Sequence, residues 1–125
     1  MEDIPGRIEA AVGSWEGVTA HEHRFGGREF RYGRRELGHL HGGTLADLPF
    51  PRRIAAMLVE TGRAEPHRFA RGGWVSFPIR GEEDVDAAIE LFRLSYERAL
   101  VAEARRAAAR AGESSPRSRP ASSAD

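Results

Sequence analysis

Residues 21–43, HEHRFGGREFRYGRRELGHLHGG, decide the fold of this chain. The stretch contains four of the five histidines together with five arginines, and it is interrupted by Gly26-Gly27 and by Gly33-Arg34. Both dipeptides are typical of the two-residue turns that connect antiparallel strands. The sequence therefore predicts a three-stranded antiparallel meander.

The two turns also predict which residues face each other. The first turn pairs Glu22 with Arg31, and the second pairs Arg31 with Glu36 and Arg28 with His39. Because side chains alternate between the two faces of a strand, the charged residues gather on one face, which we expect to be exposed. The members of this charged face are Glu22, Arg24, Glu29, Arg31 and Glu36.

The other face of the predicted meander combines histidines with aromatic and aliphatic side chains. It consists of His21, His23, Phe25, Arg28, Phe30, Tyr32, Arg35, Leu37, His39 and His41. Because the apolar members of this face must be covered, we expect helices to pack on it. The four histidines would then lie inside the core or at its rim.

The remaining sequence predicts helices and one more hairpin. In chain order these are a helix over 4–12, a loop from Thr44 that leads into a helix over 51–61, a hairpin of 66–69 and 74–79, and a helix from 82 to about 111. The predicted order is α-β-β-β-α-β-β-α, an α+β two-layer sandwich with helices on one face of an antiparallel sheet. We expect a single domain over residues 1–111 and a disordered tail over 112–125.

Composition narrows the possible functions. The chain has no cysteine, which excludes disulfides, thiolate catalysis and zinc-thiolate sites. No apolar run approaches the roughly 20 residues that span a bilayer, and the acidic start Met1-Glu2-Asp3 differs from a secretory signal peptide. We therefore expect a cytoplasmic protein with no membrane partner. All 19 basic residues are arginines, but the net charge is zero and glutamates are interleaved with them, which disfavours nucleic acid as a partner.

The histidines are the candidates for catalysis. We expect His23, His39 and His41 to act as polar contacts to a ligand or as a general base, and the alternative is that they are hydrogen-bonded at the edge of the core. The two His-x-His pairs have a spacing that suits metal chelation, but the predicted register separates His23 from His39 too far for one four-histidine site. We expect no metal and no cofactor, and one pair joined by a glutamate or by Asp47 is the remaining metal alternative.

Further ligand contacts are predicted around these histidines. They are His21, Arg28, Tyr32, Arg35 and Trp74. Arg28 and Arg35 lie on the predicted helix-facing side, where each must pair with an acid, reach the solvent or clamp an anionic ligand. Trp74 follows a glycine-rich turn and could stack on a flat ligand, unless it belongs to the core.

Three stretches of the chain carry a resemblance to a known family. They are residues 21–43 quoted above, DLPFPRRIAAMLVETGRAEPH at 47–67 and GWVSFPIRGEEDVDAAIELFRLSY at 73–96. Together they resemble the luciferase-like domain family of bacterial and fungal proteins, to which fungal luciferase is assigned. The resemblance implies an α+β domain and, for the fungal relative, a cofactor-independent oxidation of a polyphenolic pyrone by O₂. It assigns no catalytic residue to a position of this chain.

Two functions remain open at this point. In the first, a small flat molecule, anionic or aromatic, binds over the histidine-bearing face of the sheet and is oxidised by O₂. In the second, the chain is a non-enzymatic module that binds nucleic acid or a protein. The second rests on a weaker similarity of layout, in which GWVSFPI at 73–79 precedes an acidic helix start, to small bacterial proteins with a frataxin-like double-wing fold.

Overall fold

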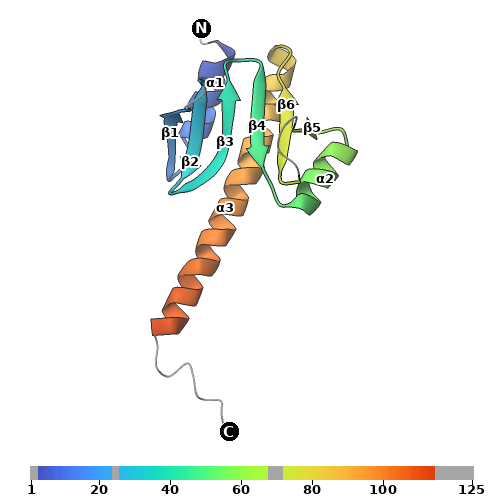
Figure 1. Ribbon diagram of the computed structural model, residues 1–125. Helices are drawn as coiled ribbons and strands as arrows, with labels where there is room; N and C mark the ends of the chain where they lie inside the picture. The colour runs from blue at the N-terminus through green and yellow to red at the C-terminus, as the bar shows by residue number, and fades with distance from the viewer. Residues whose placement is uncertain (1–2, 24–25, 68–71, 115–125) are drawn as a thin grey trace.

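The computed structural model describes residues 3–23, 26–67 and 72–114. Six strands form one antiparallel sheet, and helices cover one of its faces (Figure 1). This arrangement confirms the predicted α+β class. The elements are α1 (Ile4–Gly13), β1 (Val18–Glu22), β2 (Arg28–Tyr32), β3 (Arg35–His41), β4 (Leu45–Pro49), α2 (Arg52–Glu60), β5 (Glu65–Pro66), β6 (Trp74–Pro78), the 3₁₀ turn η1 (Glu82–Asp84) and α3 (Val85–Ser114).

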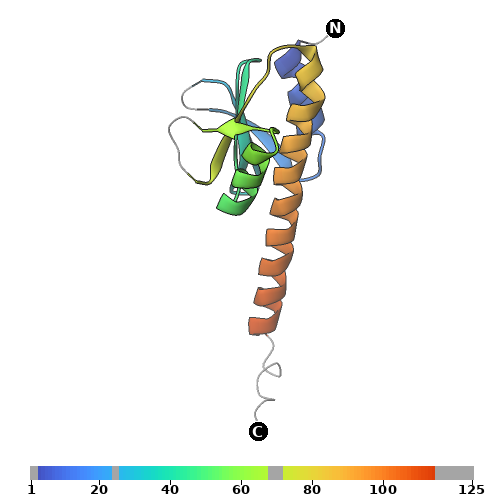
Figure 2. The same cartoon turned by 90° about the vertical axis from the view of Figure 1, so that its right-hand side faces the viewer.

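The strands lie in the order β1-β2-β3-β4-β6-β5, and each neighbouring pair is antiparallel. Figure 2 views the sheet from its edge and shows α1 and α3 together on one side of it. We call this side the covered face and the opposite side the open face. Helix α2 packs against β5 and β6 at the far end of the sheet.

The covered face carries the hydrophobic core. The side chains of Phe30, Leu48 and Phe92 are fully buried, and the rings of Phe30 on β2 and Phe92 on α3 meet edge to face with centroids 5.4 Å apart. The last predicted helix is confirmed, and its residues at helical spacing are buried: Val85, Ala88, Phe92, Tyr96 and Ala99. The C-terminal part of α3 extends past the sheet, as Figure 1 shows.

Helix α3 continues to Ser114, three residues past the predicted end at 111. The other residues of the predicted tail, 115–125, lie outside the described residues. Although α3 is 30 residues long, no helix in the described part of the chain is long and apolar enough to cross a membrane.

The predicted loop after Thr44 is wrong, because Leu45–Pro49 forms strand β4 in the middle of the sheet. Gly42, with φ +58°, lies in the turn that reverses the chain after β3. Ala46 and Leu48 then point into the core, and Asp47 between them points to the open face. Pro49 occupies the last position of the strand, beyond the residues of β4 that pair with β3.

The predicted register between the first two strands is also wrong. Glu22 pairs with Arg28 instead of Arg31, and His21 pairs with Glu29 instead of Tyr32. The glycine pair is not the whole turn, since the backbone N–H of His23 already donates to the carbonyl of Gly27. The offset is an odd number of residues, namely three. Because side chains alternate between the two faces, it moves the side chains of β1 to the opposite face of the sheet.

A β-bulge changes the second pairing. The predicted partners Arg31 and Glu36 are confirmed, but Phe30 then pairs with Gly38 instead of Leu37. His39 consequently pairs with Glu29, and the predicted contact with Arg28 is not formed. The bulge turns His39 and His41 to the open face.

The expectation that the four histidines share the helix-covered side is therefore wrong. His21, His39 and His41 belong to the open face by strand alternation, and the ring of His23 stacks on that of His39. Of the predicted charged face, Glu29, Arg31 and Glu36 lie on the open face, and Arg31 bonds to Glu29 at 2.6 Å. Glu22 does not join them, and Arg24 and Phe25 lie outside the described residues.

Candidate functional site

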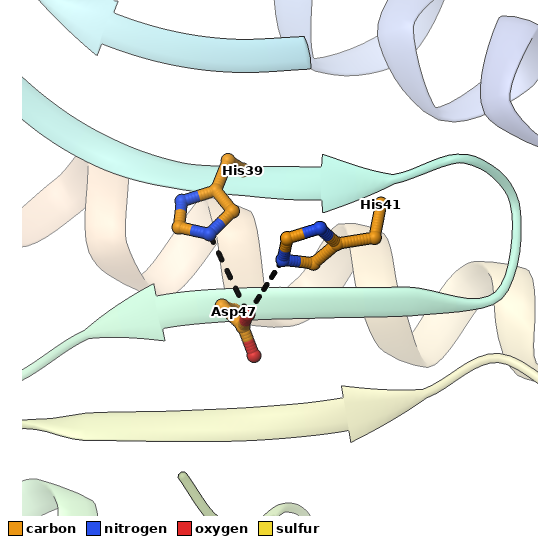
Figure 3. A group of neighbouring side chains, drawn as sticks. All are labelled: His39, His41 and Asp47. Atoms are coloured by element: carbon orange, nitrogen blue, oxygen red, sulfur yellow. Dashed lines mark hydrogen bonds and ion pairs between the residues drawn. The ribbon is translucent and has the colours of Figure 1, made fainter. Parts of the chain in front are cut away.

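The open face holds a compact group of polar and aromatic rings around one carboxylate. We call it the histidine cluster, and its members are His23, His39, His41, His67, Trp74 and Asp47. Figure 3 shows three of them, with His39 and His41 of β3 both directed at Asp47 of β4 and with helix α3 behind the sheet.

Asp47 is the centre of the cluster. Its Oδ2 atom lies 2.9 Å from Nε2 of His41, 3.5 Å from Nε2 of His39 and 3.5 Å from Nε2 of His67. The carboxylate is nearly inaccessible, with an exposed fraction of 3% for the residue, and His39 is 8% exposed. A buried carboxylate is retained in proteins only when cations or hydrogen-bond donors surround it, and here imidazoles supply them.

The side chains of Ser76 and Glu36 orient Asp47 and His39, respectively. The hydroxyl of Ser76 on β6 donates to Oδ1 of Asp47 at 2.6 Å, so Oδ2 is the oxygen presented to the imidazoles. Nδ1 of His39 donates to Oε2 of Glu36 at 2.7 Å, so Nε2 of His39 faces Asp47. The sheet register sets up these contacts, because His39, Asp47 and Ser76 are direct cross-strand neighbours on one face.

The electrostatics of this group favour a charged pair. Burial lowers the pKa of His39, but the hydrogen bonds and negative charges of Asp47 and Glu36 outweigh burial and raise this pKa to about 9. Burial likewise raises the pKa of Asp47, whereas hydrogen bonds from His39, Ser76 and His41 hold it well below its usual range. At neutral pH and with no ligand bound, His39 is therefore an imidazolium held between the carboxylates of Glu36 and Asp47.

Aromatic rings enclose the cluster on its other sides. The ring of His23 stacks on that of His39 with centroids 4.2 Å apart, and the indole of Trp74 lies 5.7 Å from His39 and 5.9 Å from His67. Of the three imidazoles that approach Asp47, that of His41 is the most accessible, since its side chain is 37% exposed. The site is thus lined by flat ring faces and is open beside His41.

A groove adjoins the cluster at Trp74 and His67. Its volume is ≈ 500 Å³, within the range of small-molecule sites. The groove runs between α2 and the edge of the sheet, where Ala55 and Val59 give it an apolar wall and Arg52 supplies a cation. A flat organic anion would therefore find a ring to stack on, an apolar wall and a positive charge in one place.

The structure brings together four of the predicted site residues, His23, His39, His41 and Trp74. His21 shares the open face but lies on the edge strand, where its Nε2 is 2.8 Å from the hydroxyl of Thr19.

The other three predicted contacts lie elsewhere. Arg28 bonds to Glu9 of α1 at 2.9 Å, and this contact raises the pKa of its guanidinium. The ring of Tyr32 packs on that of Tyr96, with centroids 5.8 Å apart. Tyr32 and Arg35 line a separate groove of ≈ 670 Å³ beside α3.

Sequence reasoning missed three members of the site. They are His67, Ser76 and Glu36, of which the sequence placed only Glu36, on the charged face of the meander. A strand at 45–49 would have revealed them, because a turn at Gly42-Gly43 followed by alternating residues places Asp47 opposite His39 and Ser76.

Fold and site together define an α+β domain with a histidine-carboxylate site on the open face of an antiparallel sheet. Residues 34–95 match the family described as Luciferase domain, so the chain belongs to the luciferase-like domain family and the predicted resemblance is confirmed. Comparison with curated proteins and with solved structures gives no match. The matched segment runs from the start of β3 into α3 and includes all members of the histidine cluster except His23.

Proposed function

We propose that this luciferase-like domain binds a small flat molecule, aromatic or anionic, beside the histidine cluster on the open face of the sheet. The observation that carries the proposal is the continuity between the cluster and the ≈ 500 Å³ groove, which share Trp74 and His67. Trp74 offers a ring face for stacking, and Arg52 offers a charge for an anionic substituent. The imidazole of His41 is the accessible hydrogen-bonding group at the open side.

The reaction class that we propose is oxidation of the bound molecule by O₂. Family membership supports it, since fungal luciferase oxidises a polyphenolic pyrone in this way. In such a reaction the electron-rich ring is the reductant and O₂ is the oxidant, so the electron balance closes between the two substrates. An electron-rich hydroxylated ring is also the kind of ligand that an indole and imidazoles accommodate.

The two tryptophans of the chain allow a direct test of binding. Trp74 borders the cluster, whereas Trp15 packs against Tyr96 and under the guanidinium of Arg93, away from the site. In a Trp15→Phe variant all tryptophan emission comes from Trp74, and in a Trp74→Phe variant it all comes from Trp15. A hydroxycinnamate and a hydroxylated pyrone serve as probes.

We expect these probes to quench the emission of the Trp15→Phe protein in a saturable manner and to leave the Trp74→Phe protein unaffected. Oxygen uptake, followed with an electrode in the presence of a bound probe, then tests the reaction. Equal quenching of both variants, or none, would rule out the groove as the binding site. Salt-sensitive binding of duplex DNA in its place would favour the non-enzymatic binding module.

The cytoplasmic location stays a prediction.

A further inference from the structure

The histidine cluster contains a set of atoms arranged like the first shell of a metal ion. Nε2 of His39, Nε2 of His41 and Oδ2 of Asp47 converge from two neighbouring strands (Figure 3). Across the described ranges 3–23, 26–67 and 72–114, these three residues form the one group of three potential ligands whose donor atoms all lie within 4.8 Å of one another. We infer that His39, His41 and Asp47 bind one divalent transition-metal ion.

The spacing of the donor atoms agrees with shared coordination. Ligand atoms about 2.0–2.1 Å from a tetrahedral ion lie roughly 3.3 Å from each other, and those of an octahedral ion lie roughly 3.0 Å apart. The observed separations from Oδ2 of Asp47 are 2.9 Å to His41 and 3.5 Å to His39. The 3.5 Å separation between Nε2 of His39 and Oδ2 of Asp47 is long for a hydrogen bond, and it is close to the separation of two ligands of one tetrahedral ion.

Hydrogen bonding alone accounts poorly for the same arrangement. Oδ1 of Asp47 already accepts from Ser76, and Oδ2 is approached by the Nε2 atoms of three imidazoles, His39, His41 and His67. A carboxylate oxygen has two lone pairs, so it cannot accept well from three donors at once. A cation between the oxygen and the nitrogens would satisfy all of them together.

The surrounding contacts are those that metal sites use. Nδ1 of His39 is held by the carboxylate of Glu36 at 2.7 Å, which directs Nε2 toward the proposed ion. Ser76 fixes the other ligand by binding Oδ1 of Asp47 at 2.6 Å, which leaves Oδ2 for the ion. Such outer contacts set the orientation of ligands and commonly change metal affinity 10–100-fold when removed.

The donor set indicates the class of metal. Two imidazoles and one carboxylate, in a chain without cysteine, suit Zn²⁺, Fe²⁺, Mn²⁺ or Co²⁺ better than the all-oxygen ions Ca²⁺ and Mg²⁺. Nε2 of His67 also lies near this donor set, 3.5 Å from Oδ2 of Asp47. The exposed side of His41 leaves room for a further ligand from solvent or from the groove.

The test uses the full chain, stripped with a chelator, and the metal ion alone. Calorimetric titration with Zn²⁺ and Mn²⁺ is combined with the visible absorption of bound Co²⁺. We expect one ion per chain and, for His41→Gln or Asp47→Asn, an affinity at least about 10-fold lower. His21→Gln is the matched control, because His21 lies on the same face but bonds to Thr19 outside the cluster, and its affinity should equal that of the wild type.

A second measurement keeps the inference open to refutation if a variant fails to fold. In the wild type, nitrogen-detected NMR of the imidazoles should show Zn²⁺-induced shifts for Nε2 of His39 and His41 and none for His21. Absence of binding for Zn²⁺, Mn²⁺ and Co²⁺ alike, or equal binding by wild type and Asp47→Asn, would overturn the metal site. Since no organic probe is added, these outcomes are independent of the quenching result at Trp74.

Discussion

The two faces of the sheet are both buried at the centre, but by opposite means. On the covered face, Phe30 and Leu48 are inaccessible because the apolar side chains of α3 lie on them. On the open face, Asp47 and His39 are 3% and 8% exposed because polar and aromatic side chains surround them. On β4, for example, Leu48 belongs to the apolar core of the covered face, whereas its neighbour Asp47 belongs to the hydrogen-bonded group of the open face.

This difference predicts different sensitivities for the two faces. Apolar burial depends on volume and is indifferent to pH, whereas a buried ion pair depends on protonation and on every partner being present. A change on the covered face should alter stability at all pH values. A change on the open face should alter the pH dependence and the binding of ligands.

The largest effect is expected from Phe92→Ala on the covered face. The ring is fully buried against Phe30, so its removal should lower the free energy of unfolding by about 3–5 kcal/mol, as measured by urea denaturation. Val101→Ala on the same helix is the control, because Val101 is 50% exposed and should change stability by less than about 0.5 kcal/mol. Similar losses in both variants would mean that α3 does not seal the core as described.

The second prediction concerns the pH dependence of the open face in chelator-treated protein. The pKa of His39 is raised from 6.5 to about 9 in the fold, so its stabilising contribution is complete below pH 6.5 and is lost as pH rises through about 9. The pKa of Asp47 is lowered, so its contribution is present above its ordinary value of 3.8 and is lost in acid. We expect the unfolding free energy to fall by on the order of 3 kcal/mol between pH 6.5 and 9.

A variant on each face sharpens this prediction. His39→Gln should flatten the alkaline loss of stability, because it removes the group that faces Glu36 on β3 and Asp47 on β4. Phe92→Ala should displace the whole curve downward without changing its slope. A wild-type curve that is flat from pH 6.5 to 9 would show that His39 is not an imidazolium between the two carboxylates.

The sequence predicted the covered face better than the open one. Helix α3 was recognisable because its apolar residues recur at helical spacing over four turns, and the short hairpin before it was recognisable from Trp74 to Pro78. Strand β4 was hidden by prolines at 49 and 51, which suit a helix entry equally well. Long periodic elements carry their own signal, whereas a five-residue strand depends on neighbours that the sequence does not display.

Four of the predicted residues, His23, His39, His41 and Trp74, gather in the histidine cluster, but the sequence did not predict the face of the sheet on which they lie. His-x-His spacing identified His39 and His41, yet their face depends on pairing partners, and an odd offset in register reverses it. Two features produced such offsets: the turn before β2 that begins at His23, and the bulge between Glu36 and Gly38. Neither changes the hydrophobic pattern, so composition and periodicity could not detect them.

Gly38 is the residue at which the two faces are coupled, and its replacement should give the smallest of the three stability effects. Its φ of +152° favours glycine, and an added Cβ would lie 2.8 Å from the ring of Phe92 and 2.9 Å from the carbonyl of Asp47. Gly38→Ala should therefore cost about 1–3 kcal/mol through crowding. Gly42→Ala is the control, because its φ is also positive but nothing lies within 4 Å of the added carbon.

Gly38→Ala should lower the free energy of unfolding more than Gly42→Ala does. The difference measures the cost of crowding where β3 closely approaches α3 and β4. Because the bulge directs His39 toward Asp47, the same variant should also weaken metal binding, although Gly38 contacts no ligand atom of the proposed site. Loss of stability with unchanged Co²⁺ affinity would show that β4 holds the cluster by itself. Loss of both would show that the packing of the covered face sets the geometry of the open one.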